Sequence, residues 1–419
     1  MENNTFMVLD VIKKGNTITY KYEVSGLWNK FINKDEIYFA QYNGEMVGVD
    51  DSIAVIPLLT NILPISWVFD LDIEIPCIDK DFLEGLEKVK LGYKNMYPNI
   101  QMKGKLQTEK IVKNNNSLEK NAVMFSGGVD AYNTLISHLE EKPYIFTIFG
   151  ADISVDDKKG YENVNKNSII ESKKHGIEYK NVISNFRKSI NYSEIMKELT
   201  KICNFEWWHD FQHGIALLGL IAPYTQILSL KKVYIASSFT KEQVGNYTCA
   251  SDPTIDNYVA FGNTKIVHDG YEFNRQQKIQ NICRYVKNNN QKINLRVCWQ
   301  SSGGKNCCKC EKCYRTIMAI IAEKEDPRNY GFELNREKYN KMIRKLPQIV
   351  KYNFRYKIIQ DRFVENYKID EIPKELKWIQ KIDIKNKKSK FIIFIEKIKR
   401  LIKNIINEVM KKLRISKSI

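Results

Sequence analysis

The sequence of 419 residues is short of acidic side chains, with 49 Asp and Glu against 66 Lys and Arg and a formal net charge of +17. It has no apolar run long enough to span a bilayer, and no signal peptide is visible in its polar first residues. We therefore expect a cytoplasmic protein, with peripheral attachment to a membrane as an open alternative. Hydrophobic residues make up 43%, which excludes a wholly disordered chain, and the length predicts two or three domains.

The basic excess is concentrated at the C-terminal end. Residues 381–419 hold 13 Lys and Arg against 3 Asp and Glu, so the rest of the chain is only weakly basic and nucleic acid is the least favoured partner. An amphipathic helix is expected over residues 391–413, with isoleucines and leucines on one face and lysines on the other. This helix could pack against a partner protein or lie on an anionic membrane surface, and a homodimer is also open.

No Gly-Lys-Ser/Thr follows the glycine pair in Ser126-Gly127-Gly128-Val129-Asp130-Ala131, which excludes a Walker loop. The pair does follow a short apolar run over 122–125, and residues 132–141 have helical apolar spacing. This is the pattern of a buried strand, a glycine turn and a helix. Such a turn can direct backbone N–H groups at phosphate oxygens, helped by the helix dipole. The alternative is an ordinary strand-to-helix turn.

Strands and helices alternate from about residue 120, which predicts an α/β fold with a parallel sheet. Further strands are expected at 144–149, 179–184 and 232–237. Ligands bind beyond the carboxyl ends of such strands, so Gly150, Asp152 and Ser237 are candidates for nucleotide contact together with the glycine loop.

A second group of polar residues follows the strand expected at 265–267. His268 ends it, and a helix over 272–285 carries Arg275 and Lys278. Together with the carboxylates Asp252 and Asp256 of the preceding polar loop, this histidine and the two cations would suit magnesium, pyrophosphate and acid–base catalysis. Ser126 and Asp130 are the other catalytic candidates. A solvated turn and an exposed basic helix face would explain the same residues.

Five of the nine cysteines lie between residues 298 and 313. Cys298, Cys307, Cys310 and Cys313 have the spacing C-x8-C-x2-C-x2-C, which predicts a closed tetrahedral zinc site, and Cys308 lies outside this spacing. An iron–sulfur cluster uses the same ligands and remains an alternative. His209 and His213, four residues apart, lack the glutamate of a metalloprotease motif, so a structural or substrate-facing role is favoured over metal.

Together the glycine loop and the four cysteines resemble the PP-loop ATP pyrophosphatases, and among them the 7-cyano-7-deazaguanine synthase family and its longer relatives. The resemblance covers about half of the chain and implies an ATP-binding domain, with ATP cut between its α- and β-phosphates. It implies that the amides of Gly127 and Gly128, the hydroxyl of Ser126 and the backbone at Val129 hold phosphates, and that Asp130 lies near Mg²⁺. Ala131 departs from the usual serine.

The expected organisation is a β-rich domain over 1–105, a linker over 106–119, the PP-loop domain with its zinc site over 120–325, and a helical extension over 326–419. In the first domain, strands are expected at 17–24, 36–41, 45–49 and 68–75. The favoured function is a carbon–nitrogen ligase that adenylates a small carboxylate or carbonyl with ATP and Mg²⁺. The alternatives are a nucleotide-sensing module and an enzyme that modifies a nucleic-acid base.

Overall fold

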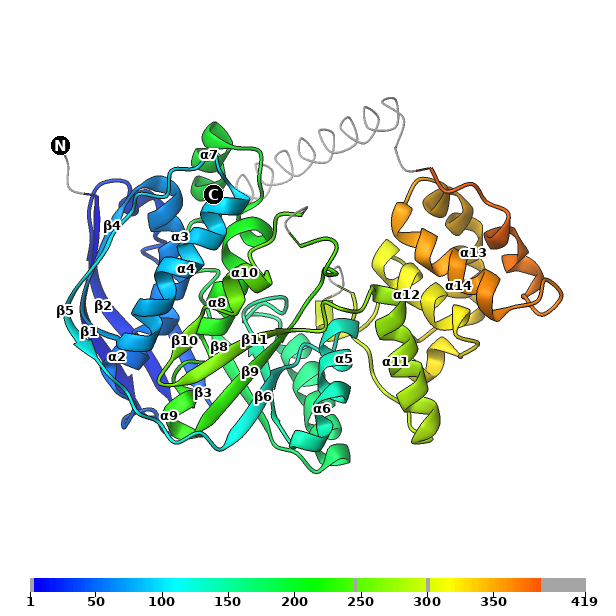
Figure 1. Cartoon of the computed structure of the whole chain (residues 1–419), viewed down its shortest axis with the longest axis horizontal. Coiled ribbons are helices and arrows are strands. Elements are labelled where there is room, and N and C mark those ends of the chain that lie inside the picture. The colour runs from blue at the N-terminus through cyan, green and yellow to red at the C-terminus, as the bar shows by residue number, and fades with distance from the viewer. Residues whose placement is uncertain (1–3, 245–246, 299–301, 386–419) are drawn as a thin grey trace, which may run out of the picture. The chain divides into compact units, whose positions relative to one another are not determined.

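The computed structural model describes residues 4–244, 247–298 and 302–385 (Figure 1). Its strands are β1 Thr5–Lys14, β2 Thr17–Val24, β3 Phe39–Tyr42, β4 Asp72–Asp79, β5 Leu106–Val112, β6 Lys120–Met124, β7 Tyr144–Phe149, β8 Tyr179–Ser184, β9 Leu230–Ala236, β10 Ala260–Phe261 and β11 Thr264–Asp269. Its α-helices are α1 Trp28–Phe31, α2 Asp51–Ala54, α3 Ile56–Phe69, α4 Lys80–Met96, α5 Val129–Ser137, α6 Lys158–His175, α7 Tyr192–Ile202, α8 His213–Gly219, α9 Tyr224–Ile227, α10 Pro253–Asp256, α11 Arg275–Asn288, α12 Glu311–Ala322, α13 Arg336–Lys351 and α14 Lys357–Asn366.

All these strands belong to one 11-stranded sheet, in the order β10-β11-β9-β6-β7-β8-β3-β2-β1-β4-β5. The segment β11-β9-β6-β7-β8 is parallel throughout, as is β1-β4-β5. The antiparallel pairs are β10/β11, β3/β8, β2/β3 and β1/β2. The expected α/β class with a mostly parallel sheet is therefore confirmed.

The strands of residues 1–105 continue the sheet that carries the glycine loop. β3 joins the two halves, because Ala40 pairs with Ser184 and Tyr42 with Val182 in antiparallel register. The segment expected as a linker contains β5, which pairs with β4 at one edge of the sheet. Contacts divide the described residues into two units, one up to Cys307 together with 327–333 and one comprising 308–326 and the residues from Leu334 onward.

Three local predictions were wrong. The strand expected at 68–75 begins only at Asp72, because α3 continues to Phe69 and Asp70 ends it in the left-handed conformation (φ 55°). Residues 45–49 form no strand in the described chain. Residues 209–230, whose apolar content predicts one long core helix, are instead divided into a π-helical turn, α8 and α9, and the chain then enters β9. In the continuous apolar runs around residues 68 and 220, no residue of the sequence marked where a helix ended and the next element began.

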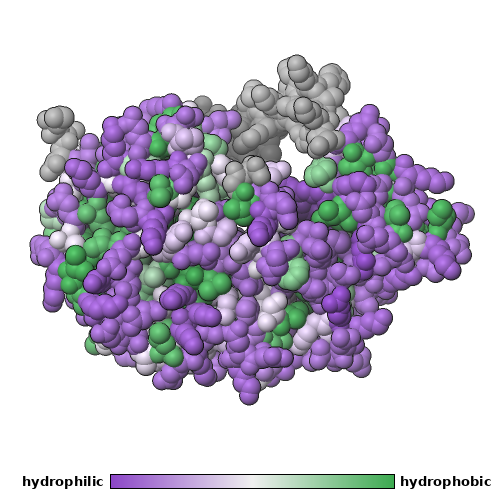
Figure 2. All heavy atoms as spheres, in the orientation of Figure 1, coloured by the Kyte–Doolittle hydropathy of each residue, from purple (hydrophilic) through white to green (hydrophobic). Residues whose placement is uncertain are grey.

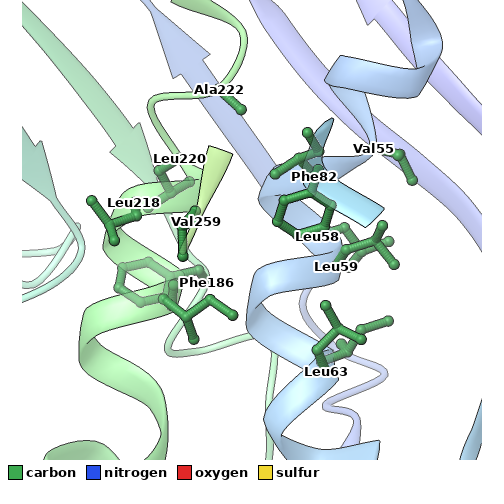
Figure 3. Packing of buried hydrophobic residues seen from close by; sticks show 14 of the residues in the cluster. Val55, Leu58, Leu59, Leu63, Phe82, Phe186, Leu218, Leu220, Ala222 and Val259 are labelled. Atoms are coloured by element: carbon green, nitrogen blue, oxygen red, sulfur yellow. The ribbon is translucent and has the colours of Figure 1, made fainter. Parts of the chain in front are cut away.

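The main core lies between the sheet and the helices around α3 and α8. α3 is buried on every side except at Phe69, as expected for a helix that is apolar all round. Figure 3 shows Leu58, Leu59 and Leu63 of α3 on one side of this core, with Leu218 and Phe186 on the other. The helices α3 and α8 approach closely, because a Cβ on Gly219 would lie 1.9 Å from Oγ1 of Thr60.

Hydrophilic side chains cover most of the face drawn in Figure 2, with apolar patches among them. On β1 the side chains alternate, with an irregularity between Val8 and Asp10 that shifts the alternation by one residue. Met7, Leu9 and Ile12 are therefore between 38% and 43% exposed, whereas Phe6 and Val8 enter the core. No helix among the described residues is long and apolar enough to cross a membrane.

The second unit is helical in its described part. α12 packs against α14 and α13, and Arg362 of α14 forms a two-pronged ion pair with Glu323, with both N–O distances 2.8 Å. Beyond residue 326 the described residues contain α13 and α14. The amphipathic helix expected over 391–413 lies outside the described residues.

Candidate functional site

The glycine loop lies between β6 and α5, at the carboxyl end of a central parallel strand. Gly127 has the left-handed conformation (φ 75°), and Gly128 is the N-cap of α5. Within the described residues no side chain caps this helix, and the amide of Gly128 donates a 3.3 Å hydrogen bond to Oγ of the exposed Ser126. A helix N-terminus without a capping side chain at the carboxyl edge of a parallel sheet is a suitable place for an anion.

Asp130, in the first turn of α5, is held by two cations from α11. Nη1 of Arg275 lies 2.6 Å from Oδ2 of Asp130, and Nζ of Lys278 lies 3.4 Å from Oδ1. Lys278 is nearly inaccessible, with a side chain 2% exposed, and it also donates to the carbonyl oxygen of Ser237 at 2.5 Å. The structure therefore brings together Asp130, Arg275 and Lys278 from the predicted set.

Ser237 itself contributes its backbone rather than its side chain. Its hydroxyl donates to the carbonyl oxygen of Phe239 at 2.7 Å, and the side chain is buried. The carbonyl that receives Lys278 lies directly after β9, the strand next to β6. This places Lys278 across the ends of two neighbouring strands.

Gly150 and Asp152 follow β7 and have different roles. Gly150 has φ 101° and is pressed against the next strand, because a Cβ there would lie 1.7 Å from the carbonyl oxygen of Ser184. Asp152 has a side chain 55% exposed, and its Oδ2 lies 3.6 Å from Nη2 of Arg296. Gly150 is thus required for close packing, whereas Asp152 is accessible beside the loop.

Arg296 is a loop contact that the sequence did not reveal. Its backbone N–H donates to the carbonyl oxygen of Gly127 at 2.7 Å, and its Nε donates to that of Ser126 at 3.1 Å. Ser126 and Arg296 are 170 positions apart, and no motif or spacing connects them. Only the fold shows that Arg296 fixes the loop.

His268 is placed apart from the cations of α11. Its Nδ1 lies 2.8 Å from Oδ2 of the buried Asp256, which also accepts a 2.6 Å bond from Ser251. The next residue, Asp269, contacts Thr134 of α5 instead, at 2.7 Å. Successive strand residues point to opposite faces, so His268 faces α10 whereas Asp269 faces α5.

His209 and His213 lie near the start of α8 with parallel rings 6.1 Å apart. Sγ of Cys249 lies 3.9 Å from Nε2 of His213. Burial lowers the pKa of His213, and burial raises the pKa of the Cys249 thiol to about 12, so both groups are neutral near pH 7. Among the described residues these side chains do not belong to a metal-ligand group.

The four predicted cysteines do converge. The sulfur atoms of Cys298, Cys307, Cys310 and Cys313 all lie within 4.8 Å of one another, and three of the four residues are buried. Thiolates around a tetrahedral zinc at about 2.3 Å would be roughly 3.8 Å apart, so a small contraction would enclose one ion. The group therefore fits a metal such as zinc.

The backbone around the first two of these cysteines is fixed by one amide side chain. Oδ1 of Asn306 accepts from the N–H groups of Val297 and Cys298 at 2.9 and 3.3 Å. Its Nδ2 donates to the carbonyl oxygens of Leu295 and Gly331 at 2.7 and 3.0 Å. Asn306 precedes Cys307 directly, so it connects both cysteines to the segment that carries Arg296.

Comparisons with known proteins do not identify this site. No family model, curated protein or solved structure matches the chain. Its function therefore rests on the geometry of the loop, the cations and the cysteine group.

Proposed function

We propose that the loop from Ser126 to Asp130 binds the phosphates of ATP. The observation that carries the proposal is the position of this loop, at the carboxyl end of β6 and the start of α5, with Arg275 and Lys278 beside Asp130. Glycine at 127 permits the left-handed turn, and oriented amides with two cations form a suitable environment for a polyphosphate.

Each residue then has a distinct task. Phosphate oxygens would accept hydrogen bonds from the amides of Gly127 and Gly128 and from the hydroxyl of Ser126. The backbone at Val129, where α5 begins, would lie next to them. Arg275 and Lys278 would stabilise the charge that develops on the leaving pyrophosphate. Asp130 would move from these cations to Mg²⁺, which binds carboxylate and phosphate oxygens.

The reaction proposed is ATP-dependent adenylation. An oxygen of a small carboxylate or carbonyl substrate attacks the α-phosphate, the bond to the β-phosphate breaks, and pyrophosphate leaves. A nitrogen nucleophile then displaces AMP from the activated carbon. His268, the candidate for proton transfer from the sequence, is buried against Asp256 and faces α10, so no step of this reaction is assigned to it. Gly150 and Asp152 are candidates to adjoin the nucleoside, since they follow the neighbouring strand.

The test is to incubate the full chain with ATP, Mg²⁺, ammonia and a panel of small carboxylic acids, and to measure pyrophosphate and AMP. Asp130→Ala should abolish their release. Glu140→Ala, an exposed carboxylate on the next turn after α5, should retain it. Release of ADP and orthophosphate instead would reject adenylation.

A second candidate is nucleotide sensing without turnover. Both carboxylate oxygens of Asp130 already have a cationic partner, and Ala131 offers no hydroxyl. Each feature reduces the ligands available to Mg²⁺. Tight binding of ATP with no product from any substrate of the panel would favour this function.

A further inference from the structure

The two carbonyl oxygens that precede the loop amides are both bound by Arg296. Ser126 accepts from its Nε and Gly127 accepts from its backbone N–H. In a planar trans peptide the C=O and the following N–H point in opposite directions. Binding both carbonyls on one side therefore turns the amides of Gly127 and Gly128 to the other side.

Arg296 is itself fixed from the cysteine segment. It lies two residues before Cys298, and Asn306 holds the backbone from Leu295 to Cys298 by three hydrogen bonds. Its side chain is 12% exposed, and Asp152 lies beside its guanidinium. A short and continuous path therefore leads from the cysteines through Asn306 and Arg296 to the glycine loop.

We infer that metal binding at the four cysteines orders the glycine loop through Asn306 and Arg296, so that metal and nucleotide bind cooperatively. A bound ion would hold Cys298 and Cys307 at fixed positions, and these residues flank the segment 299–306. Loss of the ion would release Arg296 and with it the direction of the loop amides. Arg296 is thus a positioning residue, and the identity of the anionic ligand as ATP rests on the proposed function.

Cooperativity of this kind must be reciprocal. If Zn²⁺ tightens binding of ATP by a given factor, ATP must tighten binding of Zn²⁺ by the same factor. If the metal stabilised only the residues around it, the affinity for ATP would not depend on Zn²⁺ and the affinity for Zn²⁺ would not depend on ATP. Reciprocity therefore separates a linked site from a merely structural one.

The first experiment is hydrogen exchange on the full chain, with and without Zn²⁺. We expect Zn²⁺ to slow exchange in peptides covering residues 122–131, while β1 and β2, which are remote in the sheet order, exchange at an unchanged rate. Equal exchange of residues 122–131 in both states would overturn the inference. This readout does not depend on ATP, so it decides the matter even if the proposed function fails.

The second experiment measures the affinity of α,β-methylene-ATP for the Zn²⁺-loaded and Zn²⁺-free chain by calorimetry, and the affinity of Zn²⁺ with and without the analogue. We expect a factor of about 10 in each direction. Asn306→Ala and Arg296→Lys keep all four cysteines and should reduce the factor toward 1. Lys305→Ala, whose side chain is 61% exposed and pairs with Glu333, is the matched control and should preserve it.

The outcomes are distinguishable. Binding of the analogue with equal affinity in both metal states would overturn the coupling and leave the proposed function intact. No binding of the analogue in either state would reject the proposed function, and hydrogen exchange would then decide the coupling alone. A coupling factor that stayed the same in Asn306→Ala, Arg296→Lys and Lys305→Ala would overturn the path through Asn306 and Arg296.

Discussion

Nη1 of Arg275 lies 2.6 Å from Oδ2 of Asp130, although the two residues are 145 positions apart in the chain. The pair joins the first turns of α5 and α11, which pack together. Lys278 completes it from the next turn of α11. Two cations and one carboxylate leave a net positive charge at the helix N-terminus, which favours an incoming anion.

Lys278→Met is expected to weaken nucleotide binding by about 10- to 100-fold, because hydrogen bonds to charged groups contribute roughly 1.5–3 kcal/mol. Methionine has a similar length and can fill the buried site. Lys287→Met, at an exposed position near the end of the same helix, should have no effect. Calorimetry with α,β-methylene-ATP measures both variants, and equal affinities would contradict a phosphate-binding role for Lys278.

Gly150→Ala should destabilise the first unit by about 3 kcal/mol, because a Cβ would overlap the carbonyl oxygen of Ser184 and φ is 101°. Urea unfolding followed by tryptophan fluorescence measures this. Gly48→Ala is the control, since a Cβ at that position meets nothing within 4 Å, and its effect should stay within about 0.5 kcal/mol. If Gly150→Ala and Gly48→Ala had similar free energies of unfolding, the close packing of Gly150 against Ser184 would not contribute to stability.

His138 predicts a pH dependence of stability. Burial alone would lower its pKa, but hydrogen bonds to Asp269 and Glu141 outweigh burial and raise the pKa above its usual value. A pKa raised by folding stabilises the folded chain fully below the unfolded pKa of about 6.5, and this contribution disappears as pH rises through the folded pKa.

His138→Gln should therefore lose about 1 kcal/mol near pH 6 and much less at pH 9, relative to the wild-type chain at each pH. Glutamine cannot carry the proton, although it is polar and of similar length. Free energies of unfolding from urea titrations at several pH values measure the difference. A difference that grew with increasing pH would have the wrong sign and refute the assignment.

The cysteine group predicts one metal ion per chain. Cys310→Ser should lose the ion, whereas Cys308→Ser should keep it, because Cys308 does not belong to the converging group. Elemental analysis of the purified variants measures this directly. Replacement by Co²⁺ should give the visible absorption of a tetrahedral thiolate site, while iron and inorganic sulfide in equal amounts would identify a cluster instead.

The local patterns were informative where a short segment determines its own structure. The glycine loop, the strands β7 and β8 and the spacing of the cysteines all followed from nearby residues. The converging cysteines and the parallel sheet were predicted on that basis. Such features depend on strand length, turn chemistry and ligand geometry, which a sequence displays directly.

Other features could not be predicted because they depend on distant residues. Arg296 contacts the loop only because the segment before Cys298 returns to the end of β6. The pairing of β3 with β8 likewise depends on register between strands about 140 residues apart. The β-propensity of Val68 and Phe69 predicted a strand, but both residues lie at the end of the buried helix α3. Here tertiary packing overrides the local preference of the side chains.

The pairing of β3 with β8 has a practical consequence for anyone who wishes to isolate the glycine loop. Deleting the first 105 residues would strip β8 of its neighbour and remove α3 from the apolar side of the sheet. The fragment would have β8 as an exposed edge strand and would expose apolar side chains that α3 normally covers, and both features favour aggregation. Biochemistry on the glycine loop should therefore begin with the intact N-terminal half.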